Sequence, residues 1–344
     1  MFSQQKRQVG RTALELPMFG IGMCPLGELF EEIDEDVAQE TLAAAWQAGV
    51  RYYDAAPWYG LGMGEHRLGH ALQKKPRADY VLSTKVGRRL FAPKDRAAFR
   101  HTAWVGGFEF DHVHDYTYDG IMRSYEDSLQ RLGINRVDML FIHDLDSEHF
   151  PDPAALSGKL AELENSGFRA LEELKSSGEV KAIGSGVNWR GTINAFLDRY
   201  PLDVFLVASR YTLLDQGILE DELPRVRDEG ASLVIGGVFN SGILATGAAN
   251  GARYEYTSAP AAIVERVRRI EAVAARHSVP LPAAAMRFPF GFPAVASVIS
   301  GPAKPAEIRQ NAALFDHPIP DDFWAELKAD GLLPAHVPVP LGMA

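Results

Sequence analysis

The chain has 344 residues, of which 47% are hydrophobic and 23% charged, as in a globular protein with a substantial core. Its formal net charge of −10 argues against nucleic acid or an anionic membrane as the natural partner. The one cysteine, Cys24, excludes an intramolecular disulfide and a cysteine-rich metal site. The sequence does not begin with a signal-like segment, and no apolar stretch approaches the length of roughly 20 residues that a membrane span needs. We therefore expect a soluble cytoplasmic protein.

Short apolar runs, typical of strands, alternate along the chain with stretches of helical spacing, and this alternation predicts a parallel sheet. Eight strand candidates that alternate with helix candidates favour a closed (β/α)₈ TIM barrel, with an open doubly wound sheet as the alternative. The predicted strands are Pro17–Met23, Tyr52–Asp54, Tyr80–Lys85, Val137–His143, Ala182–Ser185, Val204–Ala208, Ser232–Gly237 and Val295–Ser300. Helices are predicted around Val37–Trp46, Ile121–Leu132, Leu171–Gly178, Leu197–Tyr200, Leu219–Val226, Ile263–Ile270 and Ile308–Leu314.

No linker rich in Pro, Gly or Ser divides the chain, so residues 1–344 are expected to form a single domain. Two segments, Arg88–Thr117 and Leu145–Gly167, are too long for ordinary βα loops, and long loops in compact domains tend to be functional. The first suits a lid over a substrate, or else a loop packed on the barrel wall or on a second subunit. It is rich in aromatic residues: Phe91, Phe99, Trp104, Phe108, Phe110 and Tyr116.

Four chemically active side chains stand at or just after the ends of predicted strands. Asp54 ends one strand, and Tyr59 follows it after a turn at Pro57. Lys85 closes the next strand, and His143 closes the strand after that. Because the C-terminal ends of barrel strands face one mouth, we expect these groups to converge there.

Each of these residues alone has an ordinary structural explanation, such as a helix cap for the aspartate or a packing role for the tyrosine. Together they fit one mechanism. A phenol with a pKa near ~10 is a poor acid or base at neutral pH, but a neighbouring ammonium favours its ionised form, and a carboxylate holds that ammonium in place. A histidine beside the phenol can orient a substrate hydroxyl or carbonyl and share its proton. Tyr59 would then take a proton from an alcohol as hydride leaves carbon, or return it in reverse.

Further motifs accompany these four residues along nearly the whole chain. They are the block Tyr-Asp-x-Ala-x-x-Tyr-Gly at 53–60, Leu82–Lys85, Ser124–Leu132 with Val137-Asp138, Ile142–His143, Ile183–Asn188, and the late Gly301 and Gln310–Asn311. With them the chain resembles the aldo-keto reductase superfamily. The resemblance implies a catalytic tetrad of Asp54, Tyr59, Lys85 and His143, in which Tyr59 is the general acid and base.

The chemistry needs a hydride carrier, since no side chain can supply one. The resemblance implies a nicotinamide dinucleotide that lies extended across the barrel mouth. Asn188 would hold its carboxamide, the Phe239–Gly242 loop would line the ring and pyrophosphate, and Gln310 and Asn311 would approach the adenine. The implied cofactor-binding residues are Gly22, Met23, Asp54, Val187, Asn188, Ser209, Phe239, Asn240, Ser241, Gly242, Ser300, Gly301, Glu307, Gln310 and Asn311, and the implied substrate contacts are Trp58, Tyr59 and His143.

Two departures from the family pattern concern the nicotinamide pocket. Ala208 or Ser209 stands where relatives usually carry a glutamine near the carboxamide. The aromatic residue that usually stacks on the nicotinamide is Phe239 or Tyr211.

A third departure bears on the choice of cofactor. Glu307 stands where NADP-preferring relatives tend to carry an arginine, and its carboxylate would repel a 2′-phosphate. We therefore expect NAD, with NADP as the alternative if Lys304 or Arg309 serves the phosphate.

The other glycine-rich and histidine-rich motifs are not expected to bind a cofactor or a metal. Gly20–Gly22 and Gly184–Gly186 follow strands, but neither completes the dinucleotide fingerprint of a Rossmann dehydrogenase, the other enzyme alternative. The glycines of 60–64 indicate a tight loop. Asp111–Asp115 resembles a metal cluster but lies in the aromatic loop without a scaffold, so no metal is expected.

The stretch Asp54–Leu68 resembles one branch of the superfamily, which contains aldose 1-dehydrogenases of the L-fucose and D-threo-aldose type, L-galactose dehydrogenase and pyridoxal 4-dehydrogenase. Their substrates are cyclic hemiacetals that are oxidised to lactones. The resemblance therefore implies an aldose such as L-fucose as substrate, with pyridoxal as the alternative. His66, Trp58 and the His112–His114 segment are candidates to bind sugar hydroxyls. A non-catalytic regulatory subunit, as some proteins of this fold are, is the alternative from another class.

Overall fold

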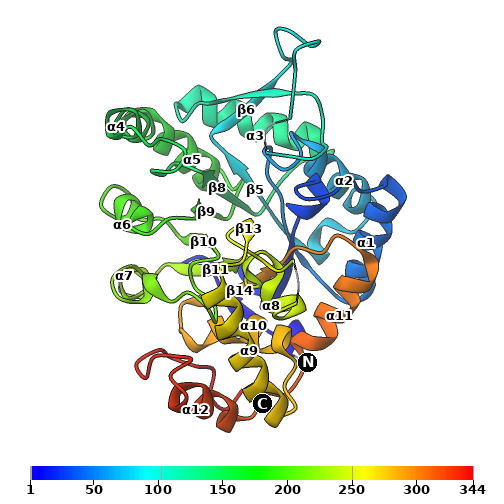
Figure 1. Cartoon of the computed structure of the whole chain (residues 1–344). Coiled ribbons are helices and arrows are strands. Elements are labelled where there is room, and N and C mark those ends of the chain that lie inside the picture. Colours follow the sequence, from blue (N-terminus) through cyan, green and yellow to red (C-terminus); the bar gives the residue numbers. More distant parts are fainter. Residues whose placement is uncertain (1, 102, 250, 344) are drawn as a thin grey trace.

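The computed structural model describes residues 2–101, 103–249 and 251–343, and within them eight parallel strands close into a barrel (Figure 1). Neighbouring strands pair in chain order, and the last, β14, pairs with the first, β3. The predicted (β/α)₈ barrel is confirmed, and the doubly wound alternative is wrong. The barrel strands are β3 (Phe19–Gly22), β4 (Tyr52–Asp54), β5 (Val81–Val86), β8 (Met139–His143), β9 (Ala182–Val187), β10 (Val204–Ala208), β11 (Ser232–Gly236) and β14 (Val295–Ser300).

Helices surround the barrel and cover the outer face of its strands (Figure 1). Their ends follow local capping rules: the Asp34 side chain accepts from the Asp36 N–H at the start of α1, and Gly133 ends α3 with a φ of 61°. The helices are α1 (Glu35–Gln47), α2 (Met63–Leu72), α3 (Tyr118–Leu132), α4 (Pro153–Glu162), α5 (Phe168–Ser176), α6 (Thr192–Leu197), α7 (Glu222–Asp228), α8 (Ile243–Thr246), α9 (Ala261–Arg276), α10 (Leu281–Arg287), α11 (Pro305–Phe315) and α12 (Asp321–Ala329). Among the described helices, none combines the length and apolarity that a membrane span requires.

An N-terminal hairpin of β1 (Lys6–Gln8) and β2 (Glu15–Pro17) covers one end of the barrel. Its buried Val9 and Leu16 belong to the same apolar cluster as Tyr52 and Phe141 from the barrel strands. Burial of this kind removes apolar surface from water at that end. The opposite, C-terminal end of the strands is therefore the end left for a site.

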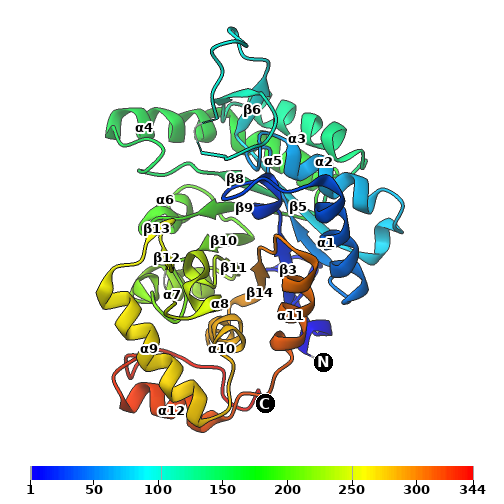
Figure 2. The ribbon, with the colours of Figure 1, turned by 45° about the vertical axis from the view of Figure 1, so that its right-hand side comes forward.

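The two long segments differ from each other. Segment 88–117 contains a hairpin of β6 (Arg88–Phe91) and β7 (Asp111–His114), and the mostly exposed residues 92–100 between the two strands project from the body of the molecule (Figure 2). The prediction of a loop over Leu145–Gly167 is wrong in its second half, because α4 and the π-helical turn η4 (Leu163–Gly167) run directly into α5. Asp152, whose side chain accepts from the Ala154 N–H, provides a helix start that the sequence pattern had not revealed.

Candidate active site

The four side chains that were expected to converge lie at the C-terminal end of the barrel strands. Asp54 is the last residue of β4, His143 is the last of β8, and Lys85 is the penultimate residue of β5. β5 pairs with both other strands, so Lys85 stands between Asp54 and His143. Tyr59 lies in the turn that connects β4 with α2.

The ammonium of Lys85 is the centre of this group. Its Nζ donates to Asp54 Oδ2 at 2.6 Å, to the Ala55 carbonyl at 2.9 Å and to the Tyr59 hydroxyl oxygen at 2.9 Å. Ser83 Oγ donates to the other oxygen of Asp54 at 2.7 Å. The side chains of Lys85 and Asp54 are each 1% exposed, so the ion pair is fully buried. A buried pair with these additional hydrogen bonds keeps both charges and fixes the ammonium against the phenol oxygen.

Close backbone packing holds Tyr59 in place. A Cβ on Gly64, in the first turn of α2, would lie 3.1 Å from Tyr59 Cβ and 3.2 Å from its carbonyl oxygen. A Cβ on Gly27 would lie only 2.6 Å from the Tyr59 carbonyl carbon. The Tyr59 ring meets the His143 ring nearly at a right angle, with centroids 6.0 Å apart. The glycines thus let the turn pack tightly, and the phenol is held between the ammonium and the imidazole.

Burial sets the protonation of both titrating groups. It raises the pKa of Tyr59 well above its usual value, and the charge of Asp54 adds to the rise. The ammonium of Lys85, 2.9 Å from the phenol oxygen, favours the ionised phenol and so opposes the effect of burial. Burial also lowers the pKa of His143 well below its usual value. At neutral pH the phenol therefore carries its proton and the imidazole is neutral.

Aromatic side chains lie against the phenol. The Trp104 ring, from segment 88–117, is 6.1 Å from the Tyr59 ring and 5.7 Å from the Trp58 ring between centroids. Trp104 is itself 5% exposed. The Phe108 N–H donates to the Gly60 carbonyl at 2.9 Å, which ties the segment to the turn after β4. Segment 88–117 therefore contacts Tyr59. This contact places the segment beside the site that a substrate lid would cover.

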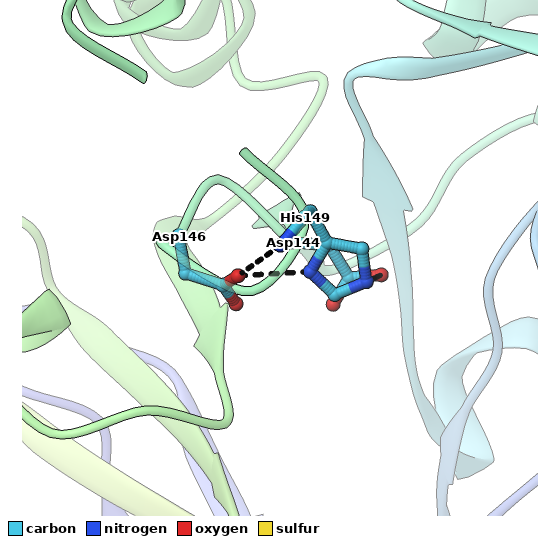
Figure 3. A group of neighbouring side chains, drawn as sticks. All are labelled: Asp144, Asp146 and His149. Carbon is cyan, nitrogen blue, oxygen red and sulfur yellow. Dashed lines mark hydrogen bonds and ion pairs between the residues drawn. The ribbon is translucent and has the colours of Figure 1, made fainter. Parts of the chain in front are cut away.

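Asp144, Asp146 and His149 form a cluster beside His143 that the sequence had not indicated (Figure 3). Atoms of the kind that bind metals lie within 4.8 Å of one another in this cluster. Asp146 Oδ1 accepts from the His149 N–H and lies 2.9 Å from His149 Nδ1. Asp144 Oδ2 pairs with the Arg88 guanidinium at 2.7 Å, a positive charge that would compete with a bound cation. The contacts are those of an ion-pair network, and the absence of a metal stays a prediction.

Three residues that the sequence had suggested as cofactor or substrate contacts lie in different environments in the structure. Tyr211 is fully buried and packs on Phe288 with ring centroids 5.3 Å apart, so it cannot stack on a nicotinamide. His66 lines a cavity of about 380 Å³ beside α2 and α3. His114 packs on Phe150 at 5.0 Å between centroids. Of the predicted stacking residues, Phe239 alone stays a candidate.

The sequence of residues 18–330 matches the model of the Aldo/keto reductase family. The chain belongs to this family. It is therefore a nicotinamide-dependent oxidoreductase.

Two relatives of this aldo/keto reductase align with nearly all of it. Pyridoxal 4-dehydrogenase of Microbacterium luteolum is 41% identical over 339 residues, which cover 96% of this chain and 98% of the relative. D-threo-aldose 1-dehydrogenase of Pseudomonas sp is 40% identical over 334 residues, covering 94% and 96%. The holo form of an aldo-keto reductase from Bacillus halodurans shares the fold, with a TM-score of 0.71 at 23% identity over 97% of this chain and 98% of that one.

The nicotinamide cofactor of an aldo/keto reductase supplies the hydride acceptor or donor that no side chain offers. The residues predicted to hold it lie at the same end of the barrel as the Lys85 group. Gly22, Val187 and Ser300 are the last residues of β3, β9 and β14. Ser209 follows β10 directly, and the Phe239–Gly242 loop follows β11. These positions lie around the one mouth of the barrel where the cofactor contacts are predicted.

The loop after β11 fits such a ligand. Asn240 is 1% exposed, and its Oδ1 has no hydrogen-bond partner among the described residues. A buried acceptor without a partner costs about 1–3 kcal/mol, so a ligand that donates a hydrogen bond there would be favoured. Asn240, Ser241 and Gly242 all have positive φ values, of 45°, 61° and 107°. The Asn240 and Gly242 N–H groups donate to the Gly237 and Phe239 carbonyls at 2.9 and 3.0 Å, so the buried Asn240 Oδ1 is the feature of this loop that favours a ligand.

The start of α11 carries the residues expected near the adenosine end. Glu307 Oε2 accepts from the Ala303 N–H at 2.8 Å, so this carboxylate also caps the turn before α11. Lys304 pairs with Glu31 at 3.1 Å, which occupies one of the two cations that were considered for a 2′-phosphate. Asn311 Nδ2 donates to Ser300 Oγ at 3.5 Å. The negative charge at 307 is thus held in place by the fold.

Proposed function

We propose that this aldo/keto reductase oxidises the C–OH group of a cyclic hemiacetal to a lactone, with NAD as the hydride acceptor. The observation that carries the proposal is the contact of Lys85 Nζ with both Asp54 Oδ2 and the Tyr59 oxygen, beside the His143 ring. We propose these four residues as the catalytic group. The relatives that align over nearly the whole chain support the substrate class, because pyridoxal and aldoses both exist as cyclic hemiacetals.

In the proposed reaction the C–H bond at the hemiacetal carbon would break with its electron pair, and NAD, when bound, would supply the acceptor for that hydride. The hydroxyl proton passes to Tyr59 Oη, and the C=O bond of the lactone forms. Because Tyr59 rests in its protonated form, it must first release that proton to solvent water, and the ammonium 2.9 Å away lowers the cost of doing so. His143 would orient the substrate oxygen. In the reverse direction the protonated Tyr59 gives its proton to the carbonyl oxygen directly.

Trp58 and Trp104 support the substrate side of the proposal. The buried Trp104 ring lies against both the Tyr59 ring and the Trp58 ring, and the half-buried Trp58 provides apolar surface on which a sugar face or a pyridine ring can pack. Trp104 also keeps water from the phenol, which strengthens the electrostatic interactions inside the site. We propose that segment 88–117 acts as the cover of the bound substrate.

The choice of NAD rests on Glu307. Its carboxylate is fixed at the start of α11, and like charges would repel a 2′-phosphate placed there. Lys304 forms an ion pair with Glu31, so Arg309 is the other cation that could bind the 2′-phosphate of NADP. The proposal also includes a single functional domain and a cytoplasmic location, the latter as expected from the single cysteine.

A panel of L-fucose, D-arabinose, L-galactose and pyridoxal, each assayed with NAD and with NADP, tests the proposal. The expected result is steady NADH formation with an aldose, with L-fucose first, and a lactone as the product. Pyridoxal is the second candidate, favoured by the aromatic rings at Trp58 and Trp104 and by the 41% identical relative. A wide margin for pyridoxal would overturn the aldose assignment and keep the chemistry. Cofactor binding without turnover on any of the four would overturn the proposal in favour of a non-catalytic subunit.

A further inference from the structure

Asp144 has an unusual backbone conformation directly after His143. Successive side chains of a strand point to opposite faces, so neighbours in sequence do not normally touch. Asp144 has a φ of 51°, a left-handed value that aspartate tolerates better than most residues. The turn brings its Oδ2 to 3.4 Å from His143 Nε2, with both side chains 8% exposed. A buried carboxylate therefore faces the imidazole of the proposed catalytic group.

The hairpin of segment 88–117 holds this carboxylate. Arg88, the first residue of β6, donates from Nη2 to Asp144 Oδ2 at 2.7 Å and is 2% exposed. Its other terminal nitrogen contacts His112 Nε2 at 3.0 Å, and its guanidinium lies 4.3 Å over the Trp58 ring. A planar cation fixed on three sides is pre-organised, so little freedom is lost in holding the carboxylate.

A second basic side chain approaches the same oxygen from the loop after β8. His149 Nε2 lies 3.6 Å from Asp144 Oδ2, and His149 Nδ1 lies 2.9 Å from Asp146 Oδ1 (Figure 3). Burial alone would raise the pKa of Asp144, but His143, Arg88 and His149 lower it, and the net shift is downward. Asp144 is thus a buried carboxylate that keeps its charge, surrounded by three basic side chains.

The backbone of the same two residues is fixed as well. The Tyr116 hydroxyl, from the other end of segment 88–117, donates to the His143 carbonyl at 2.7 Å and lies 3.3 Å from the Asp144 carbonyl. Tyr116 is fully buried, and its ring lies where a Cβ on Gly87 would come within 2.3 Å. Both ends of segment 88–117 therefore meet at the His143–Asp144 peptide.

We infer that Asp144 is a positioning residue for His143, and that Arg88 holds Asp144 in that role; this rests on the proposed function of His143. The carboxylate, 3.4 Å from Nε2, favours the proton of the neutral ring on that nitrogen, from which the ring can share it with a substrate oxygen; His143 Nδ1 is buried without a partner among the described residues. The charged or titratable groups that face His143 are Lys85, Tyr59, Asp144, Arg88 and His149. Asp144 is the acidic one among them that touches the ring.

Asp144→Asn is the direct test, because asparagine keeps the shape and tolerates the left-handed φ while it removes the charge. Partners that orient metal-binding imidazoles typically contribute 10- to 100-fold, and we expect kcat to fall by about the same factor here. KM should stay within about threefold, and the affinity for NAD, measured by fluorescence titration, should not change. The pH profile of kcat should shift as well. A purely structural role predicts instead a lower thermal midpoint with an unchanged kcat and pH profile in the folded fraction, and would overturn the inference.

Two adjacent arginines provide the matched control. Arg88→Met removes the partner of Asp144, whereas Arg89→Met removes a more exposed ion pair with Asp115 on the same hairpin. The inference predicts a loss of kcat in Arg88→Met that resembles that of Asp144→Asn, and wild-type kcat in Arg89→Met. Equal losses in both arginine variants would show that the hairpin alone is responsible and would overturn the role of Asp144.

Histidine NMR separates this inference from the proposed function, because it needs no turnover. With ¹⁵N-labelled histidine, the His143 ring in the wild type should show its proton on Nε2 at neutral pH. Asp144→Asn should mix the two tautomers, and Arg88→Met should raise the pKa of His143, since Arg88 opposes its protonation. If the wild type oxidises none of the four hemiacetals but these signals behave as stated, the function fails and the positioning role stands. Unchanged His143 signals in both variants would overturn the positioning role.

Discussion

Replacement of Lys85 by methionine removes the cation at the centre of the proposed catalytic group. Nζ makes contacts of 2.6 Å with Asp54, 2.9 Å with Ala55 and 2.9 Å with Tyr59. After the change, Asp54 is left fully buried with the Ser83 hydroxyl as its remaining side-chain donor. Removal of one partner of a buried ion pair costs about 3–5 kcal/mol, because an uncompensated charge stays in the interior. We therefore expect Lys85→Met to lose about that much free energy of unfolding at pH 7, together with its activity.

The loss should depend on pH in a defined direction. Burial raises the pKa of Asp54, and the charge of Lys85 is the first influence that opposes this rise. The folded variant would therefore bind a proton at Asp54 more tightly than the unfolded chain, where aspartate titrates near ~3.9. A group with a raised folded pKa contributes stability that is present below the unfolded pKa and is lost as pH rises through the folded pKa. The deficit of Lys85→Met should thus be largest near neutral pH and shrink toward about pH 4.

Urea unfolding followed by circular dichroism, between pH 4 and 8, measures this deficit from the transition midpoint and slope. Lys159→Met is the control, because its pair with Glu162 is partly exposed, at 27% and 32%, and such pairs contribute about 0–1 kcal/mol. A second variant, Asp54→Asn combined with Lys85→Met, should recover part of the stability without activity. A deficit below about 1 kcal/mol that does not vary with pH would refute the reasoning, since that is the range of exposed pairs.

Three further changes test other parts of the site. Trp104→Ala should raise KM for the hemiacetal about tenfold, roughly 1.4 kcal/mol of binding, with NAD affinity within twofold; a higher Kd for NAD instead would contradict the cover role. Glu307→Arg should raise the ratio of kcat/KM with NADP to that with NAD at least ~10-fold, and should cost about 1 kcal/mol of stability through the lost contact with Ala303. Because burial raises the pKa of Tyr59, hemiacetal oxidation should accelerate as pH rises and carbonyl reduction should slow; steady-state rates from pH 6 to 10 that show no such opposition would contradict its role as acid and base.

The barrel could be predicted from sequence because its strands are buried on both faces. Such strands are continuous apolar runs, and the eight runs marked the eight strands with ends that shift by at most two residues. The helix α4 was missed, since Gly158 and the prolines at 151 and 153 weaken the local helical pattern. Its start depends on the Asp152 cap, a contact that a run of apolar residues does not reveal.

Part of the candidate site could likewise be predicted from the sequence, and part of it could not. Asp54 and Tyr59 lie five positions apart in a specific motif, and strand ends place Lys85 and His143 beside them, so their convergence followed from sequence. Tyr211 was one of two candidates to stack on the nicotinamide, and its burial excludes it, because sequence position does not reveal that its ring lies in the core. The Asp144–Arg88 pair was missed altogether. It depends on the φ of 51° at one residue and on the pairing of β5 with β8, and neither is encoded in a local pattern.

Transfer of a labelled hydride tests the central claim most directly. The protein would be incubated with NAD and with L-fucose or pyridoxal that carries deuterium at the hemiacetal carbon, and NADH and product would be analysed by mass spectrometry. The account predicts one deuterium in NADH, a lactone as product, and loss of both in Tyr59→Phe while that variant still binds NAD. Turnover that leaves the deuterium on the product, or a Tyr59→Phe variant with wild-type rates, would contradict it.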